Sequence, residues 1–234
     1  MGIRVGVVNF PGSWSETDFV HAFGRLPSAE PELIWHTRTS LAGIDVVILP
    51  GGFSYGDHLR AGAIAARSPL MAAVVEFANA GGTVLGSCNG FQVLCEAGLL
   101  PGLLRRNAST RYRCDWVHLK VDGRPTRFTS GAPEGSLLRL PISHGEGSYQ
   151  ADERTIAELE GEGRVALRYA SPAGAADRAH NPNGSINNIA GIVNPGGNVL
   201  GLMPHPERAC EKLLGGADGN VLLESVLRFA AGAA

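Results

Sequence analysis

Cys88 stands in a setting that favours covalent catalysis. A short apolar run, residues 83–87, leads into this cysteine, and a helical pattern follows it at once. Gly86 and Gly90 lie two residues before and after it, where side chains would collide in a sharp turn between strand and helix. The start of a helix also offers free N–H groups and a positive dipole end, which favour a negatively charged sulfur and a nearby oxyanion. A buried core cysteine is the alternative, but the glycine pair favours a nucleophile.

A cysteine nucleophile needs a histidine, and the histidine needs a carboxylate that orients it. Two pairs have a suitable spacing, His144 with Glu146 and His205 with Glu207. Prolines flank His205 and favour an extended backbone, in which residues i and i+2 face the same way. Glu207 could then reach one imidazole nitrogen while the other faces Cys88, so we expect this pair to be catalytic. In the block His144-Gly145-Glu146-Gly147, glycines lie on both sides of Glu146, which suits a flexible backbone that touches a ligand. For both pairs the alternative is a polar surface loop.

Gly51 and Gly52 form a third candidate feature. They follow an apolar strand pattern at 45–50, and adjacent glycines let backbone N–H groups converge on a negative atom, as an oxyanion hole requires. An ordinary tight turn also uses two glycines. The loop lacks the Gly-Lys-Ser/Thr of a phosphate-binding loop. No third ligand joins the histidine–glutamate pairs at a suitable spacing, so no metal site is expected.

The elements that must position these groups alternate between strand and helix in the first hundred residues. Strands are expected at 3–10, 33–37, 45–50 and 83–87. Helices are expected after a capping-box-like start at Ser15, after Ser68-Pro69, and over 89–97. This order predicts a parallel sheet covered by helices.

From 105 to 150 the pattern changes. Residues 117–121 alternate as in a half-exposed strand, with loops or hairpin connections at 105–114 and 123–135. A helix over 152–160, strands near 165–170, 189–193 and 199–203, and a helix from about 218 complete the chain. We therefore expect one α/β domain over residues 1–234: a central, mostly parallel sheet flanked by helices, with a small antiparallel excursion.

Composition excludes several classes of protein. Twenty Lys and Arg against 22 Asp and Glu give a net charge of −2, which provides no field for nucleic acid or anionic membranes. The four cysteines form no C-x-x-C, so a zinc knuckle or thioredoxin-type motif is absent. Neither a signal-peptide pattern nor an apolar run of 18 residues occurs. A soluble, cytoplasmic protein with reduced thiols is expected.

Five blocks of sequence, in the same order, resemble one family. They are GGFSYGDHLRAGAIA at 51–65, CNGFQ at 88–92, PISHGEG at 141–147, NPNGS at 181–185 and LMPHPER at 202–208. The trio of Gly-Gly loop, cysteine elbow and Pro-His-Pro-Glu resembles the class I (triad) glutamine amidotransferases. The full set resembles, more narrowly, the glutaminase (glutamine amidotransferase) subunits of phosphoribosylformylglycinamidine synthase.

The resemblance implies roles for named residues. Cys88 would attack the side-chain amide of glutamine and form a glutamyl thioester, with release of ammonia. His205 would move the proton, and Glu207 would orient the histidine and stabilise its charge. Backbone N–H groups of Gly52 and Asn89 would form the oxyanion hole. Three residues would bind the amino-acid end of glutamine: Gln92, Gly145 and Glu146.

The resemblance also implies partners. Ammonia would pass to a separate ATP-dependent synthetase that converts formylglycinamide ribonucleotide to formylglycinamidine ribonucleotide in purine biosynthesis. A large synthetase subunit and a small accessory subunit are expected to assemble with this chain. ATP and magnesium are expected in the synthetase, and no cofactor in this chain.

Some positions depart from the family pattern. His58 stands where an aromatic residue, commonly Tyr, is expected, and Ser87 stands where many members have a β-branched residue. The segment Arg105–Arg127 carries six arginines and matches only loosely; it is either a solvated loop or part of the synthetase interface. Two other functions stay open. One is a stand-alone thiol hydrolase of γ-glutamyl or peptide bonds, and the other is a non-catalytic interaction subunit, against which the intact Cys-His-Glu set argues.

Overall fold

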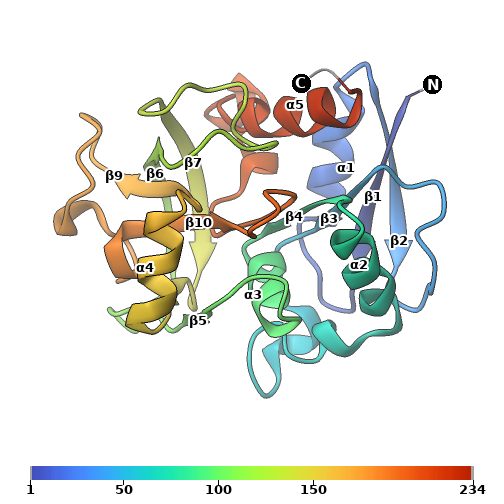
Figure 1. Ribbon diagram of the computed structural model, residues 1–234, viewed down its shortest axis with the longest axis horizontal. Helices are drawn as coiled ribbons and strands as arrows, with labels where there is room; N and C mark the ends of the chain where they lie inside the picture. The colour runs from blue at the N-terminus through green and yellow to red at the C-terminus, as the bar shows by residue number, and fades with distance from the viewer. Residues whose placement is uncertain (1, 233–234) are drawn as a thin grey trace.

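The computed structural model describes residues 2–232 and is built around a nine-stranded sheet (Figure 1). The strand order in this sheet is β2-β1-β3-β4-β11-β10-β9-β6-β7. Its strands are β1 (Ile3–Asn9), β2 (Ala29–Trp35), β3 (Val46–Leu49), β4 (Thr83–Ser87), β6 (Arg113–Val121), β7 (Leu137–His144), β9 (Val165–Ala170), β10 (Ile189–Val193) and β11 (Val199–Leu202). A separate pair consists of β5 (Leu103–Arg105) and β8 (Ser148–Gln150).

Helices cover both faces of the sheet. They are α1 (Glu16–Gly24), α2 (Pro69–Asn79), α3 (Asn89–Glu96), α4 (Glu153–Gly161) and α5 (Gly219–Ala230). Strand β3 shows why both faces need cover, since its four residues are all fully buried. Val46 and Ile48 pack into the core shared with α1 and α5, whereas Val47 and Leu49 pack into the core shared with α2, α3 and α4. The alternation is the two-residue period of a strand.

The sheet has a parallel and an antiparallel half. Strands β2, β1, β3, β4 and β11 pair in parallel, and β10, β9, β6 and β7 then continue in antiparallel pairs. The α/β fold class expected from the sequence is confirmed, with four strands in the antiparallel part. Figure 1 shows β6, β7 and β9 together at the side of the molecule away from β1 and β2.

The parallel half brings three chain segments to one edge. Strands β3, β4 and β11 are direct neighbours and run in the same direction. Their carboxyl ends lead into Gly51, Cys88 and His205, respectively. Open α/β sheets place their functional sites at this edge, so the fold gathers the three sequence candidates before any side-chain contact is considered.

Local details differ from two sequence expectations. Helix α1 does begin after Ser15, but the Ser15 hydroxyl caps no helical N–H; it accepts a hydrogen bond from the Gly51 N–H at 2.9 Å. Strand β7 was not expected. It contains Pro141, which is rare in strands, and it is tolerated because β7 lies at the end of the sheet order.

The chain ends and the lengths of the helices also bear on the sequence expectations. Residues 1, 233 and 234 of the expected 1–234 domain lie outside the described residues. Between residues 2 and 232, none of the helices combines the length and apolar character that a bilayer crossing demands.

Candidate functional site

Cys88 occupies a strained turn between β4 and α3. Its φ of 51° and ψ of −107° lie in a region that residues with a Cβ rarely adopt. A Cβ on Gly86 would lie 2.7 Å from the Gly90 carbonyl, and a Cβ on Gly90 would lie 2.0 Å from the Leu49 oxygen. Glycine is therefore required at both positions. The structure places the thiol on the elbow that the sequence predicts.

His205 and Glu207 form a buried pair beside this elbow. The His205 Nδ1–H donates to Glu207 Oε1 at 2.6 Å, and the two residues are 2% and 1% exposed. Burial alone would lower the pKa of His205, but the charges of Glu207 and Cys88 raise it to about 10. The imidazole is thus held as a proton carrier, with Nδ1 on the carboxylate and Nε2 free to serve the sulfur.

Gly51 leaves the space that the histidine and the cysteine share. A Cβ at this position would lie 2.7 Å from His205 Cε1 and 3.3 Å from Cys88 Cβ. Any side chain here would push the imidazole away from the thiol. The requirement for glycine at 51 is thus steric, since the His205 ring and the Cys88 Cβ both lie against the space that a Cβ would fill.

Ser87 makes a contact that sequence reasoning missed. Its hydroxyl lies 3.2 Å from the Pro204 carbonyl oxygen and 3.4 Å from Glu207 Oε2, and it donates to one of these acceptors. A small residue with a hydroxyl at the end of β4 is the sequence feature from which this hydrogen bond could have been predicted. A β-branched aliphatic side chain at 87 would offer Glu207 no donor.

Two backbone N–H groups belong to residues that follow Gly51 and Cys88 directly, those of Gly52 and Asn89. Gly52, with φ of 138°, is held by bonds on either side of it, from the Trp14 N–H to the Gly51 oxygen and from the Phe53 N–H to the Gly12 oxygen. Asn89 is the first residue of α3. Among the described residues, neither the Gly52 N–H nor the Asn89 N–H has a backbone or side-chain acceptor. Unpaired N–H donors in these two residues suit an oxyanion hole.

The side chains of Asn89 and Gln92 connect the elbow to the second loop. Asn89 Nδ2 donates to Gln92 Oε1 at 2.8 Å and to Asp57 Oδ1 at 3.2 Å, and Asn89 Oδ1 accepts from the Ser54 N–H. Gln92 Nε2 donates to the Glu146 carbonyl oxygen at 2.7 Å. The Gln92 amide is therefore engaged at both ends.

The predicted substrate residues Gly145 and Glu146 lie in the turn after β7. The Gly145 carbonyl accepts from the Asn107 N–H at 2.9 Å. The Glu146 carboxylate lies 3.5 Å from Arg106. Glu146 makes no contact with His144, although the two have the same spacing as His205 and Glu207. Equal spacing in the sequence thus gives a catalytic-type pair in one loop only.

His144 is buried next to His205 but has a different partner. Its Nδ1–H donates to Asn107 Oδ1 at 3.1 Å, since Asn107 Nδ2 donates to the carbonyls of Arg111 and His144. Burial, with a smaller effect of His205, lowers the pKa of His144 to about 4. His144 is therefore neutral at pH 7. Asn107, which fixes the loop, was missed by the sequence reasoning.

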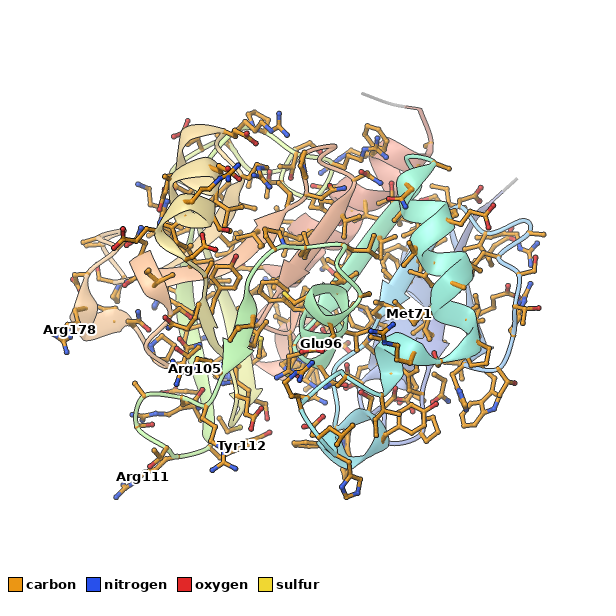
Figure 2. All side chains as sticks on the ribbon, turned by 60° about the horizontal axis from the view of Figure 1, so that its bottom comes forward. Met71, Glu96, Arg105, Arg111, Tyr112 and Arg178 are labelled. Atoms are coloured by element: carbon orange, nitrogen blue, oxygen red, sulfur yellow. The ribbon has the colours of Figure 1, made fainter. Side chains whose placement is uncertain are left out.

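Two hollows share the side chain of His205. The smaller, of about 220 Å³, is lined by Trp14, Gly52, Phe53, Tyr112, Ser143, His205 and Arg208. The larger, of about 430 Å³, lies beyond the catalytic pair and shares Ser143, His205 and Arg208 with the first. Figure 2 shows Arg111 and Tyr112 on a loop that projects past the ends of β6 and β7. Of these two hollows, only the smaller includes Gly52, and Cys88 lines neither of them.

The arginine-rich segment divides between two ends of the molecule. Arg105, Arg106, Arg111 and Arg113 are exposed and lie near the loop that carries Tyr112. Arg127 is at the far end of β6, where its guanidinium stacks over Phe229 at 4.0 Å. The segment is thus not one surface.

The other cysteines lack the surroundings of Cys88. Burial raises the pKa of the Cys95 and Cys210 thiols, and Cys114 is exposed on β6. One group of possible metal ligands exists within residues 2–232, formed by His21, Cys210 and Glu211. Glu211 is already paired there with His21 at 2.9 Å and with Arg25 at 3.3 Å.

Comparison with known proteins identifies the family. The model of the CobB/CobQ-like glutamine amidotransferase domain matches residues 2–216. The chain belongs to this family. Two relatives, each a phosphoribosylformylglycinamidine synthase subunit PurQ, are 54% identical to it. The protein from Moorella thermoacetica aligns over 96% of this chain and 95% of its own length, and that from Salinibacter ruber over 97% of each.

A solved structure agrees with these relatives. The structure of PurLQS from Thermotoga maritima contains a chain that is 41% identical and superposes with a TM-score of 0.87, over 98% of this chain and 99% of that one. The resemblance predicted from the five sequence blocks is confirmed, and the protein is an amidotransferase-family enzyme.

Proposed function

We propose that the chain hydrolyses glutamine to glutamate and ammonia, and that it does so as the glutaminase subunit of a phosphoribosylformylglycinamidine synthase. The observation that carries the proposal is the set of Cys88, His205 and Glu207 beside the two free N–H groups. The relatives named above support the choice of the synthase.

The arrangement of these residues supports the following reaction. The Cys88 sulfur attacks the amide carbon of glutamine, and the N–H groups of Gly52 and Asn89 donate to the oxygen that becomes negative. His205 delivers a proton from Nε2 to the leaving nitrogen, so ammonia departs and a glutamyl thioester remains. Water then attacks the thioester while His205 takes up its proton, and glutamate and the thiol are released. Glu207 stabilises the positive imidazole throughout.

Ammonia is useful to a second enzyme only if it is not lost to water. We propose that a large synthetase subunit docks over the mouth of the smaller hollow, with a small accessory subunit in the same complex. Trp14 at the mouth is 70% exposed and Tyr112 is 51% exposed, and such aromatic side chains are typical interface anchors. The exposed Arg105, Arg111 and Arg113 have no acidic partner within 4.0 Å among the described residues, which suits an acidic partner surface.

The synthetase would hold ATP and magnesium and replace the amide oxygen of formylglycinamide ribonucleotide with nitrogen, to give formylglycinamidine ribonucleotide. We place the reaction in the cytoplasm. No residue of this chain is assigned to a metal or to ATP.

Glutamine hydrolysis with and without the synthetase tests the proposal. The isolated chain should hydrolyse glutamine slowly and accelerate when the partner is added, whereas a stand-alone thiol hydrolase would be fast in both cases. A Cys88→Ala variant should abolish glutamine-dependent synthesis, and ammonia-dependent synthesis should persist because it bypasses the thiol. Loss of both reactions would mean that Cys88 is structural.

An electrophilic glutamine analogue tests the nucleophile directly. It should label Cys88 and spare Cys95, Cys114 and Cys210, as read by peptide mass spectrometry. Labelling of another cysteine at an equal rate would overturn the assignment. Full synthesis without any labelling or hydrolysis would favour a non-catalytic subunit.

A further inference from the structure

A hollow of about 440 Å³ lies at the opposite end of β4 from the catalytic cysteine. We call it the arginine hollow, after Arg124 and Arg127 in its wall. Arg127 donates to the hydroxyl of Thr83, the first residue of β4, at 3.2 Å, whereas Cys88 follows the last residue of that strand. A strand of this length spans roughly 16 Å. The arginine hollow also shares no lining residue with the two hollows at His205, so it is a separate site.

Backbone carbonyls fix both arginines in place. Arg124 Nη2 donates to the Pro195 oxygen at 2.7 Å, and Arg127 Nη1 donates to the Gly81 oxygen at 2.7 Å. The Arg127 guanidinium also stacks over the Phe229 ring at 4.0 Å. Because a guanidinium has five N–H donors, each arginine keeps several for a ligand. The two side chains are therefore preorganised donors.

The arginine hollow lacks a negative charge to balance its two guanidinium groups. Among the described residues, no Asp or Glu lines it, and no carboxylate oxygen lies within 4.0 Å of Arg124 or Arg127. Glu134 lines an adjoining hollow that shares Arg124, but it forms no ion pair with that arginine. Burial lowers the pKa of Arg127, and no carboxylate opposes this effect. A bound anion would offset the cost of burying the charge.

Two fixed guanidinium groups suit a phosphate better than a carboxylate. A phosphate monoester carries between about 1.5 and 2 negative charges at pH 7 and offers three acceptor oxygens. Each arginine fork can bind two of these oxygens at once. A carboxylate has one charge and two oxygens, so a single arginine already satisfies it.

The rest of the wall suits an organic group attached to the phosphate. Pro125, Pro195 and Phe229 give the arginine hollow an apolar side. Ser130 also lines it, and the Ser130 hydroxyl makes no hydrogen bond to any described residue. The volume lies within the range of small-molecule sites, roughly 300 to 1,000 Å³. A monoester can therefore use the apolar wall as well as the arginines, whereas inorganic phosphate uses the arginines alone.

We propose that the arginine hollow is a second ligand site, which binds a small phosphate monoester between Arg124 and Arg127. A ligand held by both arginines joins the segment after β6 to the turn between β10 and β11 and to the turn before β4. Binding therefore stabilises the folded chain. The site does not depend on glutamine hydrolysis.

Calorimetric titration of the full chain with phenyl phosphate and with inorganic phosphate, at constant ionic strength, tests this site. Wild type should bind phenyl phosphate more tightly, and binding should raise the midpoint of thermal unfolding. Arg124→Gln and Arg127→Gln should each weaken phenyl phosphate binding about 10- to 100-fold, the usual effect of losing a hydrogen bond to a charged group. Arg124→Lys should weaken it less, because the charge remains while the fork is lost.

Arg178→Gln is the matched control. Arg178 is exposed, projects from the surface in Figure 2 and does not line the arginine hollow. Its variant should bind phenyl phosphate as wild type does. Arg127 also holds the turn at Gly81, so Arg124→Gln decides the outcome if Arg127→Gln proves unstable.

Three results would overturn the inference. The first is that wild type binds neither phosphate below about 10 mM. The second is that Arg124→Gln and Arg178→Gln bind phenyl phosphate equally well. The third is that the variants at Arg124 and Arg127 weaken only assembly with the synthetase, because the arginine hollow would then hold an acidic side chain of a protein partner.

Discussion

Two buried histidines, His205 and His144, share one site and differ in charge. They are 2% and 3% exposed, and both donate from Nδ1 to an oxygen. In both rings Nε2 is buried without a nitrogen or oxygen partner. Yet the pKa of His205 is raised to about 10, whereas that of His144 is lowered to about 4.

The partner of Nδ1 makes the largest contribution to the difference, and the Cys88 sulfur beside His205 adds to it. His205 meets the Glu207 carboxylate, and His144 meets the neutral amide oxygen of Asn107. Burial penalises the charged form of both rings, and only an opposite charge overcomes that penalty. Depth in the protein therefore does not decide which histidine carries a proton; one charge on the neighbouring side chain does.

Replacing His205, the histidine expected to carry the proton, should have the largest effect. His205→Asn should lower glutamine hydrolysis by the assembled synthase about 10⁴-fold, because no other group can move a proton between sulfur, leaving nitrogen and water. His144→Asn is the matched control and should retain at least a tenth of the activity. Equal losses in steady-state assays would show that the two histidines are not functionally distinct.

Glu207→Gln gives His205 the same kind of partner that His144 has. The pKa of His205 should then fall below that of a free histidine, because burial is no longer opposed by the carboxylate. Hydrolysis at pH 7.5 should drop about 10²-fold. Imidazole NMR shifts followed against pH measure the pKa. An unchanged titration would mean that Glu207 does not set the charge.

The low pKa of His144 predicts how the stability of the protein depends on pH in acid. Since its folded pKa lies below the unfolded value of 6.5, its contribution to stability is complete above pH 6.5. That contribution is lost as the pH falls below 6.5 and through about 4. The difference between the two pKa values corresponds to about 3 kcal/mol of unfolding free energy. Urea unfolding at pH 7 and pH 4.5 should therefore show wild type losing more stability than His144→Gln. For His205 the sign is opposite: its contribution is complete below pH 6.5 and is lost as the pH rises toward 10.

Ser87→Ala should give the smallest effect. It removes a hydroxyl that lies near Glu207, so we expect a loss of about 1 kcal/mol in unfolding free energy and less than a tenfold loss in hydrolysis. Ser87→Thr keeps the donor and serves as the control. A loss as large as that of Glu207→Gln would mean that Ser87, rather than the carboxylate alone, holds His205.

Local sequence signals predicted the features that depend on chain neighbours. Gly86 and Gly90 indicated the elbow by their spacing; a Cβ on Gly86 would meet the Gly90 carbonyl within the turn, whereas a Cβ on Gly90 would meet the Leu49 carbonyl of β3. The prolines beside His205 predicted that Glu207 would face its ring, as it does at 2.6 Å. Both features were visible from residues within two positions of Cys88 or of His205.

Features that depend on distant neighbours could not be predicted in this way. Asn107 reaches His144 from 37 positions away, and Asp57 meets Asn89 from 32 positions away. Strand β7 escaped prediction because Pro141 argues against a strand, and only its place at the sheet edge makes it acceptable. The identical spacing of His144 and Glu146 misleads for the same reason, since the course of the chain after β7 decides where Glu146 points.

The close approach of Gly90 to the Leu49 carbonyl also bears on when the nucleophile becomes reactive during folding. The first turn of α3 can settle only after β3 has paired with β4, because its backbone rests against the end of β3. His205 comes from far along the chain, in the segment that follows β11. A nascent or partly unfolded chain therefore carries Cys88 as an ordinary thiol, and the reactive group exists only once the whole parallel half has assembled.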